Sequence, residues 1–340
     1  MSEISLNNNN KRSNTFRDAF LDWDKKKLKR TIQIIFIIEL LLFLYLFLIN
    51  RNPMNWVNVQ VGAPGQPQFL FSIYGANEKD FMNKPMAVCV SGNRIYVADT
   101  GNQRVQVFDY NGAPLFKFGK DGKKQGEFRF PYGIATDPSG KIYVADLYNG
   151  NVSVFTKDGE FLNYFSNSVE IKGPAGLYVD KDRIYVTDVA LNQVKVFDLN
   201  GQKLFAFGKT GTGKGEFQSP NSVWVNGNSI YVSDTGNDRV QTFNKLGGFL
   251  SVLSDKNDTG EALFVNPRGV AVDPRGVVYV VNNLTHQIFG FDNGGNRLWT
   301  FGSMGGESEQ FFLPNGLFAD DQGRLYITDT VNQRVQVYSY

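Results

Sequence analysis

A segment of about 46 residues recurs six times in this 340-residue chain, and this repeat constrains the fold more than any other feature. Each copy begins with a proline and a short apolar run, followed by a turn and an alternating segment such as NRIYVADT or GRLYITDT. The prolines lie 43 to 47 residues apart, at Pro85, Pro131, Pro174, Pro220, Pro267 and Pro314. Alternation of apolar and polar residues predicts β-strands, so each copy is expected to open with two strands.

Two further strands follow in most copies. A third segment, such as RVQVFD or QVKVFD, is present in all six copies, and a fourth, such as KLFAFG or RLWTFG, is present in five. Four short strands per copy at this period are typical of a β-propeller blade. The sixth copy ends at Tyr340 without a fourth strand, but QFLFSIYG at residues 68–75 has the same pattern. We therefore predict an all-β, six-bladed propeller that this N-terminal strand closes.

The N-terminal region has a different character. Residues 31–49 read TIQIIFIIELLLFLYLFLI, in which only Glu39 is charged, and this run is long enough to span a bilayer as a helix. Five basic residues precede it between positions 25 and 30, whereas only Arg51 closely follows it. This asymmetry predicts a cytoplasmic N-terminus and an extracytoplasmic propeller, held by a single-pass anchor in the cell membrane. The pattern fits both a Glu39 that is merely tolerated within the span and a Glu39 that has a function there.

These features divide the chain into four parts. We expect a basic cytoplasmic tail over residues 1–30, a transmembrane signal anchor over 31–50, a linker over 51–66 and the propeller over 67–340. Residues 1–30 carry a net charge of +4, so the rest of the chain is slightly acidic, because the whole chain has only +2. A slightly acidic domain outside the cytoplasm has no broad basic surface, and we predict that it binds no nucleic acid.

The segment GKTGTGKG at residues 208–215 resembles a phosphate-binding loop. That motif needs a Ser or Thr after the lysine and a helix that begins there, but Gly215 stands in the hydroxyl position and Pro220 follows closely. Similar segments precede Pro131 and Pro314 at the same distance. We interpret all three as connections between blades and predict no nucleotide site.

The repeats resemble the NHL family, in which Pro-x-Gly is followed by a Tyr-Val-Ala-Asp-like strand end and Asn-x-Arg-Val-Gln-Val-Phe. The segments YVADTGNQRVQVF, YVSDTGNDRVQTF and YITDTVNQRVQVY are nearly intact copies of that pattern, and the resemblance extends over about residues 66 to 340. It implies a six-bladed propeller but no single activity, because relatives include protein-binding and RNA-binding modules, and related propellers include lyases and hydrolases.

Charged residues recur at equivalent positions of the repeats. A carboxylate at a strand end can accept turn N–H groups, and a nearby guanidinium can bridge strands, so we predict a structural role for this repeat motif. Its residues are Asp99, Arg104, Asp146, Asp188, Asp234, Arg239, Asp329 and Arg334. Cys89, the single cysteine, is expected to be a small core residue.

Function in a propeller is expected where the blades converge and the sequence departs from the repeat. The residue after each repeat proline varies most, and the turn after the second strand departs from the pattern in the second and fifth copies. The resulting candidate binding residues at the channel mouth are Tyr132, Tyr148, Asn221, Arg268, His286 and Asn315.

Enzymatic alternatives have less support in the residues. Catalytic zinc commonly takes three protein ligands, but His286 is the only histidine. Calcium prefers carboxylates among its oxygen ligands, whereas the positions after the prolines offer only the amides of Asn221 and Asn315 and include Arg268. We expect no cofactor, with Ca²⁺ as the alternative. The sequence favours a membrane-anchored binding module for a protein, a peptide or a small polar ligand; a divalent-metal-dependent hydrolase or lyase is the alternative.

Overall fold

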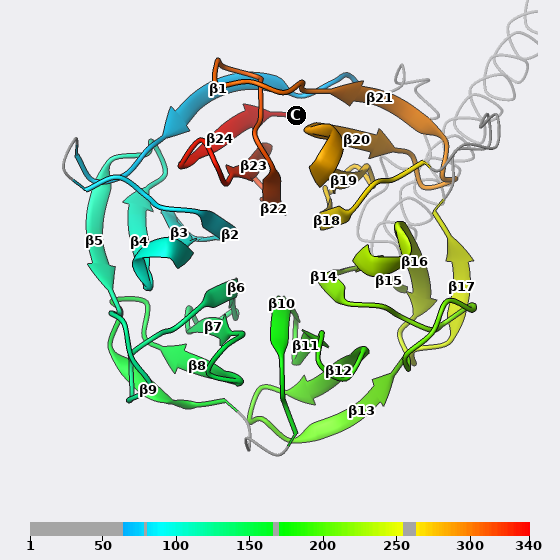
Figure 1. The fold of residues 1–340 in the computed structure, drawn as a ribbon, viewed down its shortest axis with the longest axis horizontal. Helices are drawn as coiled ribbons and strands as arrows, with labels where there is room; N and C mark the ends of the chain where they lie inside the picture. The colour runs from blue at the N-terminus through cyan, green and yellow to red at the C-terminus, as the bar shows by residue number, and fades with distance from the viewer. Residues whose placement is uncertain (1–63, 78–79, 166–169, 254–262) are drawn as a thin grey trace, which may run out of the picture. The chain divides into compact units, whose positions relative to one another are not determined.

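The computed structural model describes residues 64–77, 80–165, 170–253 and 263–340, all within a unit that extends from Ala63 to Tyr340. Its strands form six separate four-stranded antiparallel sheets, arranged as blades around a central channel (Figure 1). The six-bladed propeller predicted from the repeat is therefore confirmed. The predicted membrane span over residues 31–49 lies outside the described residues, and no helix within them is long and apolar enough to cross a membrane.

The innermost strands line the channel, and each begins at a repeat proline. They are β2 (Pro85–Ser91), β6 (Pro131–Thr136), β10 (Pro174–Asp180), β14 (Pro220–Asn226), β18 (Pro267–Val272) and β22 (Pro314–Ala319). A proline is tolerated here because the first residue of a strand can forgo its N–H donor. We call the end of the ring where these strands begin the proline face.

The second and third strands carry the most regular part of the repeat. The second strands are β3 (Arg94–Asp99), β7 (Ile142–Asp146), β11 (Arg183–Asp188), β15 (Ser229–Asp234), β19 (Val278–Asn282) and β23 (Arg324–Asp329). The third strands are β4 (Arg104–Asp109), β8 (Asn151–Phe155), β12 (Gln193–Asp198), β16 (Arg239–Asn244), β20 (Gln287–Phe291) and β24 (Arg334–Ser339). Short 3-10 turns join them in three blades: η2 (Thr100–Asn102), η3 (Thr235–Asn237) and η4 (Asn283–Thr285).

The outermost strands show how the ring closes. Five of them follow their third strands directly: β5 (Pro114–Phe118), β9 (Phe161–Tyr164), β13 (Lys203–Phe207), β17 (Phe249–Val252) and β21 (Arg297–Phe301). In the sixth blade this place is taken by β1 (Gln68–Ile73), which pairs antiparallel with β24, so that Phe69 lies opposite Tyr338 and Ile73 opposite Val335. The N-terminal strand therefore completes the last blade, as the sequence predicts.

The hydrophobic core lies between neighbouring blades. Val194 and Val196 of the third blade, for example, belong to the same buried cluster as Val223 and Val232 of the fourth. Cys89 is fully buried in β2, in agreement with its prediction as a core residue. Apolar faces on both sides of each sheet explain why the second strands have nearly continuous apolar runs, such as IYVA in β3 and β7.

The glycine-rich segment at residues 208–215 lies in the connection from β13 to β14, and no helix follows it. Its Gly213 N–H donates to the Glu216 carboxylate over 2.9 Å. This hydrogen bond and Lys209 hold the pKa of Glu216 below its usual value. Glu127 accepts from the Lys124 N–H in the equivalent connection of the first blade. These loop amides therefore bind a carboxylate of their own chain, which leaves the phosphate-loop resemblance without a structural counterpart.

Candidate functional site at the proline face

Close backbone approach between neighbouring inner strands positions the residues of the proline face. A Cβ atom added at Gly133 would lie 2.0 Å from the Ala175 carbonyl oxygen, and one added at Gly316 would lie 2.5 Å from that of Met86. Gly176 and Gly269 face the carbonyls of Asn221 and Asn315 in the same way. The glycine of Pro-x-Gly is thus required because the backbone of the next blade occupies the space of a side chain.

Tyr132 crosses the channel at this face. Its hydroxyl donates to Oδ1 of Asn221 and also lies 3.2 Å from Oδ1 of Asn315. The same hydroxyl accepts a hydrogen bond of 3.1 Å from Nη1 of Arg268. One side chain of the second blade therefore contacts the fourth, fifth and sixth blades, and we call these four residues the cross-channel cluster.

The four side chains of the cross-channel cluster do not form a ring of accessible polar groups around the channel mouth. Tyr132, Asn221 and Asn315 are each less than a tenth exposed, and their polar atoms contact one another. The Asn315 amide also donates to the Met86 carbonyl over 2.8 Å. Of the four, only Arg268 is half-buried, which leaves it the most accessible polar group of the cluster.

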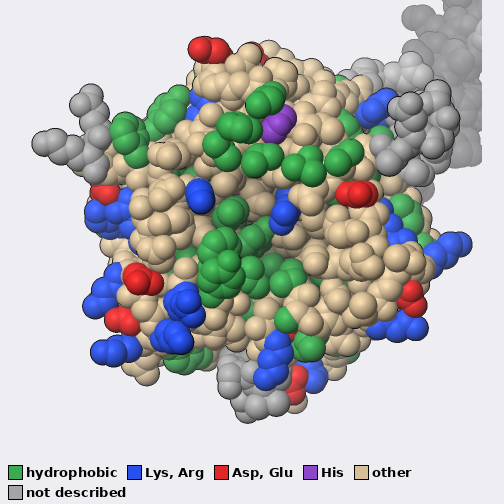
Figure 2. Space-filling model, in the orientation of Figure 1, with side chains coloured by type: hydrophobic (Ala, Val, Ile, Leu, Met, Phe, Trp, Pro, Cys, Tyr) green, Lys and Arg blue, Asp and Glu red, His purple; other side chains and the backbone are tan. Residues whose placement is uncertain are grey.

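An aromatic surface leads outward from the cluster. Phe130 stacks on Tyr132 with ring centroids 6.2 Å apart and contacts Tyr148 at 4.6 Å. Tyr148 is 61% exposed and lies in the turn after the second strand, where the first and fourth blades have Gly101 and Gly236. Figure 2 shows hydrophobic side chains, among which tyrosine is counted, and basic side chains near the centre of the face that also carries the single histidine.

A cavity of about 350 Å³ opens beside this surface. Its lining combines apolar side chains of Leu147, Ala175 and Val189 with polar groups of Ser219, Asn221 and Arg268. Arg268 donates from Nε to the Asn266 amide oxygen and from Nη1 to Tyr132. No carboxylate among the described residues forms an ion pair with it. The cavity therefore presents a cation without a counter-ion, next to exposed aromatic area.

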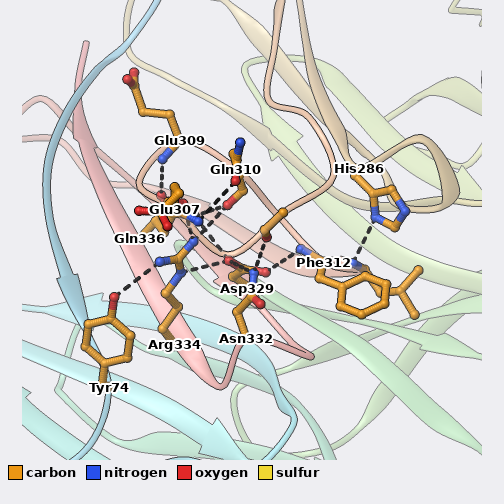
Figure 3. Close-up of polar contacts among 12 residues, drawn as sticks. Tyr74, His286, Glu307, Glu309, Gln310, Phe312, Asp329, Asn332, Arg334 and Gln336 are labelled. Atoms are coloured by element: carbon orange, nitrogen blue, oxygen red, sulfur yellow. Dashed lines mark hydrogen bonds and ion pairs between the residues drawn. The ribbon is translucent and has the colours of Figure 1, made fainter.

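His286 forms a contact that joins two blades. It adopts a left-handed conformation with φ of 60°, and its Nδ1 accepts a hydrogen bond of 3.1 Å from the Leu313 N–H. Asp238 has the equivalent conformation and accepts from the Asn266 N–H in the same way. Figure 3 shows His286 beside Phe312, at the junction with the next blade. Its observed contacts are those of a blade-joining residue.

Asn283 also keeps a repeat contact in spite of its different side chain. Its amide donates to the Pro314 carbonyl over 2.7 Å, as the Thr235 hydroxyl donates to the Pro267 carbonyl over 2.6 Å. The sequence could not reveal this equivalence, because an amide and a hydroxyl share no similarity except the capacity to donate a hydrogen bond. The fifth blade therefore differs from the repeat in its residue types, but this hydrogen bond between neighbouring blades is kept.

The repeat motif forms a buried polar network, best seen in the sixth blade (Figure 3). Asp329 accepts from the Phe312 N–H over 2.7 Å and from Asn332, Arg334 and Gln336 through its other oxygen. Arg334 is 2% exposed and donates to the carbonyls of Glu307 and Gln310, which fixes the loop before β22. Burial would lower the pKa of Arg334, but hydrogen bonds with Tyr74 and Asp329 raise it.

The other blades repeat this network with variations. Asp99 with Arg104 and Asp234 with Arg239 form the same ion pairs, at 2.6 and 2.7 Å. In the third blade Gln193 lies opposite Asp188 where other blades have the arginine, and Lys195, two residues later, pairs with Asp188 over 2.9 Å. Asp146 accepts from the Arg129 and Phe130 N–H groups and from Asn149. All eight motif residues thus lie within blades, away from the cavity of the proline face.

Comparisons with known proteins agree with this architecture. The fold defines the chain as a closed six-bladed β-propeller, and a family model described as a 6-bladed beta-propeller matches residues 165–253. The NHL repeat model matches residues 82–108, 128–155 and 313–338. These three segments therefore match the NHL repeat, as the repeat motifs indicated.

Among curated proteins, the chain is similar to Protein brain tumor of Drosophila melanogaster, with 32% identity over 142 residues, which is 41% of this chain and 14% of that protein. It is also similar to NHL repeat-containing protein 3 of Mus musculus, with 29% identity over 106 residues, which is 29% of this chain and 30% of that protein. The matches thus span less than a third of either relative.

Among solved structures, the fold is similar to a catalytically inactive virginiamycin B lyase from Staphylococcus aureus with quinupristin. The TM-score is 0.54 at 13% identity, covering 81% of this chain and 87% of that one. A protein of unknown function from Bacteroides thetaiotaomicron gives 0.59 at 14% identity, covering 81% and 72%. At these identities the likeness extends to the fold alone.

Proposed function

We propose that this protein is a membrane-anchored, extracytoplasmic recognition module that binds a protein or peptide segment, or a small polar ligand, at its proline face. The observation that carries the proposal is the Arg268 guanidinium, which forms no ion pair with any described carboxylate and is joined through Tyr132 and Phe130 to the exposed ring of Tyr148. Arginine and tyrosine are the residue types that most often dominate binding energies at protein interfaces. A half-buried cation also favours an acidic or carboxylate-bearing ligand.

The rigid surroundings support recognition by a preformed surface. The cross-channel cluster joins four blades, so the side chains beside the cavity cannot move independently of the ring. A preformed site loses less conformational entropy on binding than a mobile one. The proposed anchor at residues 31–49 would add to this effect by holding the propeller near other membrane proteins.

Capture of partners from membranes with the full-length protein tests the proposal. We expect that Tyr148→Ala and Arg268→Gln each reduce specific capture at least about tenfold, as truncation of an interface hot spot does. Tyr164→Ala is the matched control, because Tyr164 is 37% exposed but lies on the outer strand β9 of the same blade. Equal capture by all three variants would contradict a site at the proline face.

The anchor is tested separately by cell fractionation and protease accessibility. We expect the full-length protein in the membrane fraction and its propeller exposed on the extracytoplasmic side, whereas a chain that lacks residues 31–49 should leave the membrane fraction. Recovery of both chains in the soluble fraction would argue against the anchor and leave the binding site on the propeller unaffected.

A calcium titration addresses the metal-dependent alternative. We expect no stoichiometric heat with Ca²⁺, since the amide oxygens of Asn221 and Asn315 already face the Tyr132 hydroxyl and the Arg268 cation lies beside them. Calorimetry on the full-length protein measures this. Tight binding that Asn221→Ala and Asn315→Ala abolish would reverse the conclusion and favour a metal-dependent hydrolase or lyase.

A further inference from the structure

The channel contains an aromatic layer on the inner side of the cross-channel cluster. The residue four positions after each repeat proline is small in three blades, where Cys89, Ala135 and Ala271 are buried. In the other three blades this position holds Tyr178, Trp224 and Phe318. One layer of the ring thus has large aromatic side chains in β10, β14 and β22 and small ones in β2, β6 and β18.

The three aromatic side chains meet inside the channel. The ring centroids of Tyr178 and Trp224 are 4.4 Å apart, and those of Trp224 and Phe318 are 5.4 Å apart. Trp224 belongs to the fourth blade and Phe318 to the sixth, with the fifth blade between them. Contact between blades that are not neighbours requires the side chains to extend into the channel, where they form one aromatic wall.

A cavity of about 430 Å³ lies against this wall. The cross-channel cluster closes it toward the proline face, and Val88, Ala135 and Thr136 line the side with the small residues. At its other end the cavity reaches Gly92 and Gln322, in the turns where the first and second strands of two blades connect. Because those turns lie at the opposite end from the prolines, the cavity is a well that opens on the opposite face.

The wall of the well carries polar atoms without partners. Within the part of the chain that the structure describes, neither the Tyr178 hydroxyl nor Nε1 of Trp224 takes part in a hydrogen bond, and neither is among the fully buried unsatisfied atoms. Since both residues line the well, these two donors are accessible from it. A flat ligand that carries hydrogen-bond acceptors would satisfy them while its face covers the rings.

The two ends of the well carry charged side chains of opposite sign. Arg268 lines its closed end, and no described carboxylate forms an ion pair with it there. At the open end Asp320 is buried, and it accepts from the hydroxyls of Tyr110 and Tyr326 and from the Gln322 N–H, whereas Asp321 is exposed to solvent. The inner end of the well is therefore cationic and its open end acidic, and the cation favours a ligand whose negative group reaches the inner end.

We propose that this well is a second binding site, on the other side of the cross-channel cluster from the proline face, for a small planar organic anion. Its ring would lie on Trp224 and Tyr178, and its anionic group would face Arg268. The volume is in the range of small-molecule sites, which are usually apolar cavities with a few placed polar groups. The ligand enters from the face opposite to the one on which Tyr148 lies. Arg268 lines both cavities, so the two sites share this cation.

Calorimetric titration of the full-length protein with 2-naphthoate tests this site. We expect saturable binding that weakens about fivefold in Tyr178→Phe, which loses one hydrogen bond, and at least about tenfold in Arg268→Gln, which loses a charged partner. The uncharged 2-naphthamide should bind at least about tenfold more weakly for the same reason. Thr136→Trp, which fills the small side of the well, should abolish binding.

Tyr148→Ala is the matched control, since it removes an aromatic ring at the proline face and should leave 2-naphthoate affinity unchanged. No saturable binding to the unaltered protein would overturn the proposal, and so would binding that is lost in Tyr148→Ala but retained in Tyr178→Phe and Thr136→Trp. Tyr178→Phe keeps the ring and gives a result even if Thr136→Trp does not fold. Arg268→Gln alters both sites, whereas Tyr178→Phe and Thr136→Trp alter only the well, so partner capture at the proline face can fail or succeed without affecting the result for these two variants.

Discussion

A single hydroxyl group connects several blades of this propeller. The Tyr132 side chain starts on the second blade and reaches Asn221, Arg268 and Asn315 on three others. Loss of its hydroxyl would remove a hydrogen-bond partner from Oδ1 of Asn221 and from Nη1 of Arg268, and a polar neighbour from Oδ1 of Asn315. Groups of this kind are costly when unsatisfied, because water does not replace the missing hydrogen bond. The hydroxyl of this one residue therefore holds the cross-channel cluster together.

Tyr132→Phe tests that dependence. We expect it to lower the free energy of unfolding by about 1 to 3 kcal/mol, the usual cost of leaving buried polar groups unpaired. Urea denaturation followed by tryptophan fluorescence measures the change. Tyr148→Phe removes the same atom from a ring that is 61% exposed and should change stability by less than about 0.5 kcal/mol. Similar losses in both variants would argue against a role for the cross-channel contacts.

Gly316→Ala tests the backbone packing beside the cluster. The added Cβ would lie 2.5 Å from the Met86 carbonyl oxygen and 2.8 Å from Cα of Ala87, so the first and sixth blades must separate. We expect a loss of about 2 to 4 kcal/mol, as for other severe core overpacking. In Gly306→Ala the nearest atom would be 3.8 Å away, and no comparable loss should occur. Thermal denaturation of both variants separates steric clash from the general effect of replacing glycine.

Pairs of adjacent strands carry the repeat motif as a unit. Asp329 at the end of β23 lies opposite Arg334 at the start of β24, and the same register places Asn282 opposite Gln287 in the fifth blade. The fifth blade shows that an amide pair can occupy these positions, because Asn282 still accepts the Val265 N–H over 2.7 Å. The second blade places Asp146 opposite Asn151, so at the scale of a hairpin these positions accept either an ion pair or neutral hydrogen-bond partners.

The double variant Asp329→Asn with Arg334→Gln reproduces the fifth-blade pair in the sixth blade. We expect Asp329→Asn alone to cost about 3 to 5 kcal/mol, since it leaves the buried Arg334 without a carboxylate. Arg334→Gln in addition should recover part of this loss, because it removes the unpaired charge. Chemical denaturation of both single variants and the double variant measures the coupling. Strictly additive losses would contradict the ion-pair explanation.

The whole molecule depends on the pairing of its two ends. Without β1, the third strand β24 would become an open edge, because the sixth blade has no other outer strand. Tyr338 and Val335 on that edge pack against Phe69 and Ile73 of β1. An unpaired edge with apolar neighbours tends to associate with other chains, and a ring without closure also loses the cooperativity that joins its blades.

Removal of β1 by truncation tests whether the ring needs its closing strand. A chain that begins at residue 64 keeps β1 and should give one cooperative unfolding transition, whereas a chain that begins at residue 76 should unfold at a lower temperature and associate into larger species. Size-exclusion chromatography and differential scanning calorimetry of both chains measure this. Identical transitions for the two chains would show that β1 is dispensable for the stability of the ring.

Local patterns in the chain were sufficient to predict the blades, their number and the closing strand. The alternation of side chains in a strand and the period of the repeat are properties of neighbouring residues, so they can be read without knowledge of long-range contacts. The glycine of Pro-x-Gly was visible as a pattern, but its cause is a carbonyl of the next blade. The prediction of an anchor at residues 31–49 stays a prediction, since those residues lie outside the described ranges.

The burial and hydrogen bonding of the candidate site residues depend on contacts between residues far apart in the sequence. Tyr132 and Asn315 are 183 positions apart, and nothing near either residue indicates that their side chains meet across the channel. His286 and Asn283 differ from the repeat in residue type, yet they form the same hydrogen bonds as their counterparts in other blades. Trp224 and Phe318 likewise meet only because the ring brings two blades that are not neighbours to one channel. Strand patterns are local, whereas the polarity and accessibility of a channel come from side chains that converge only after the ring has closed.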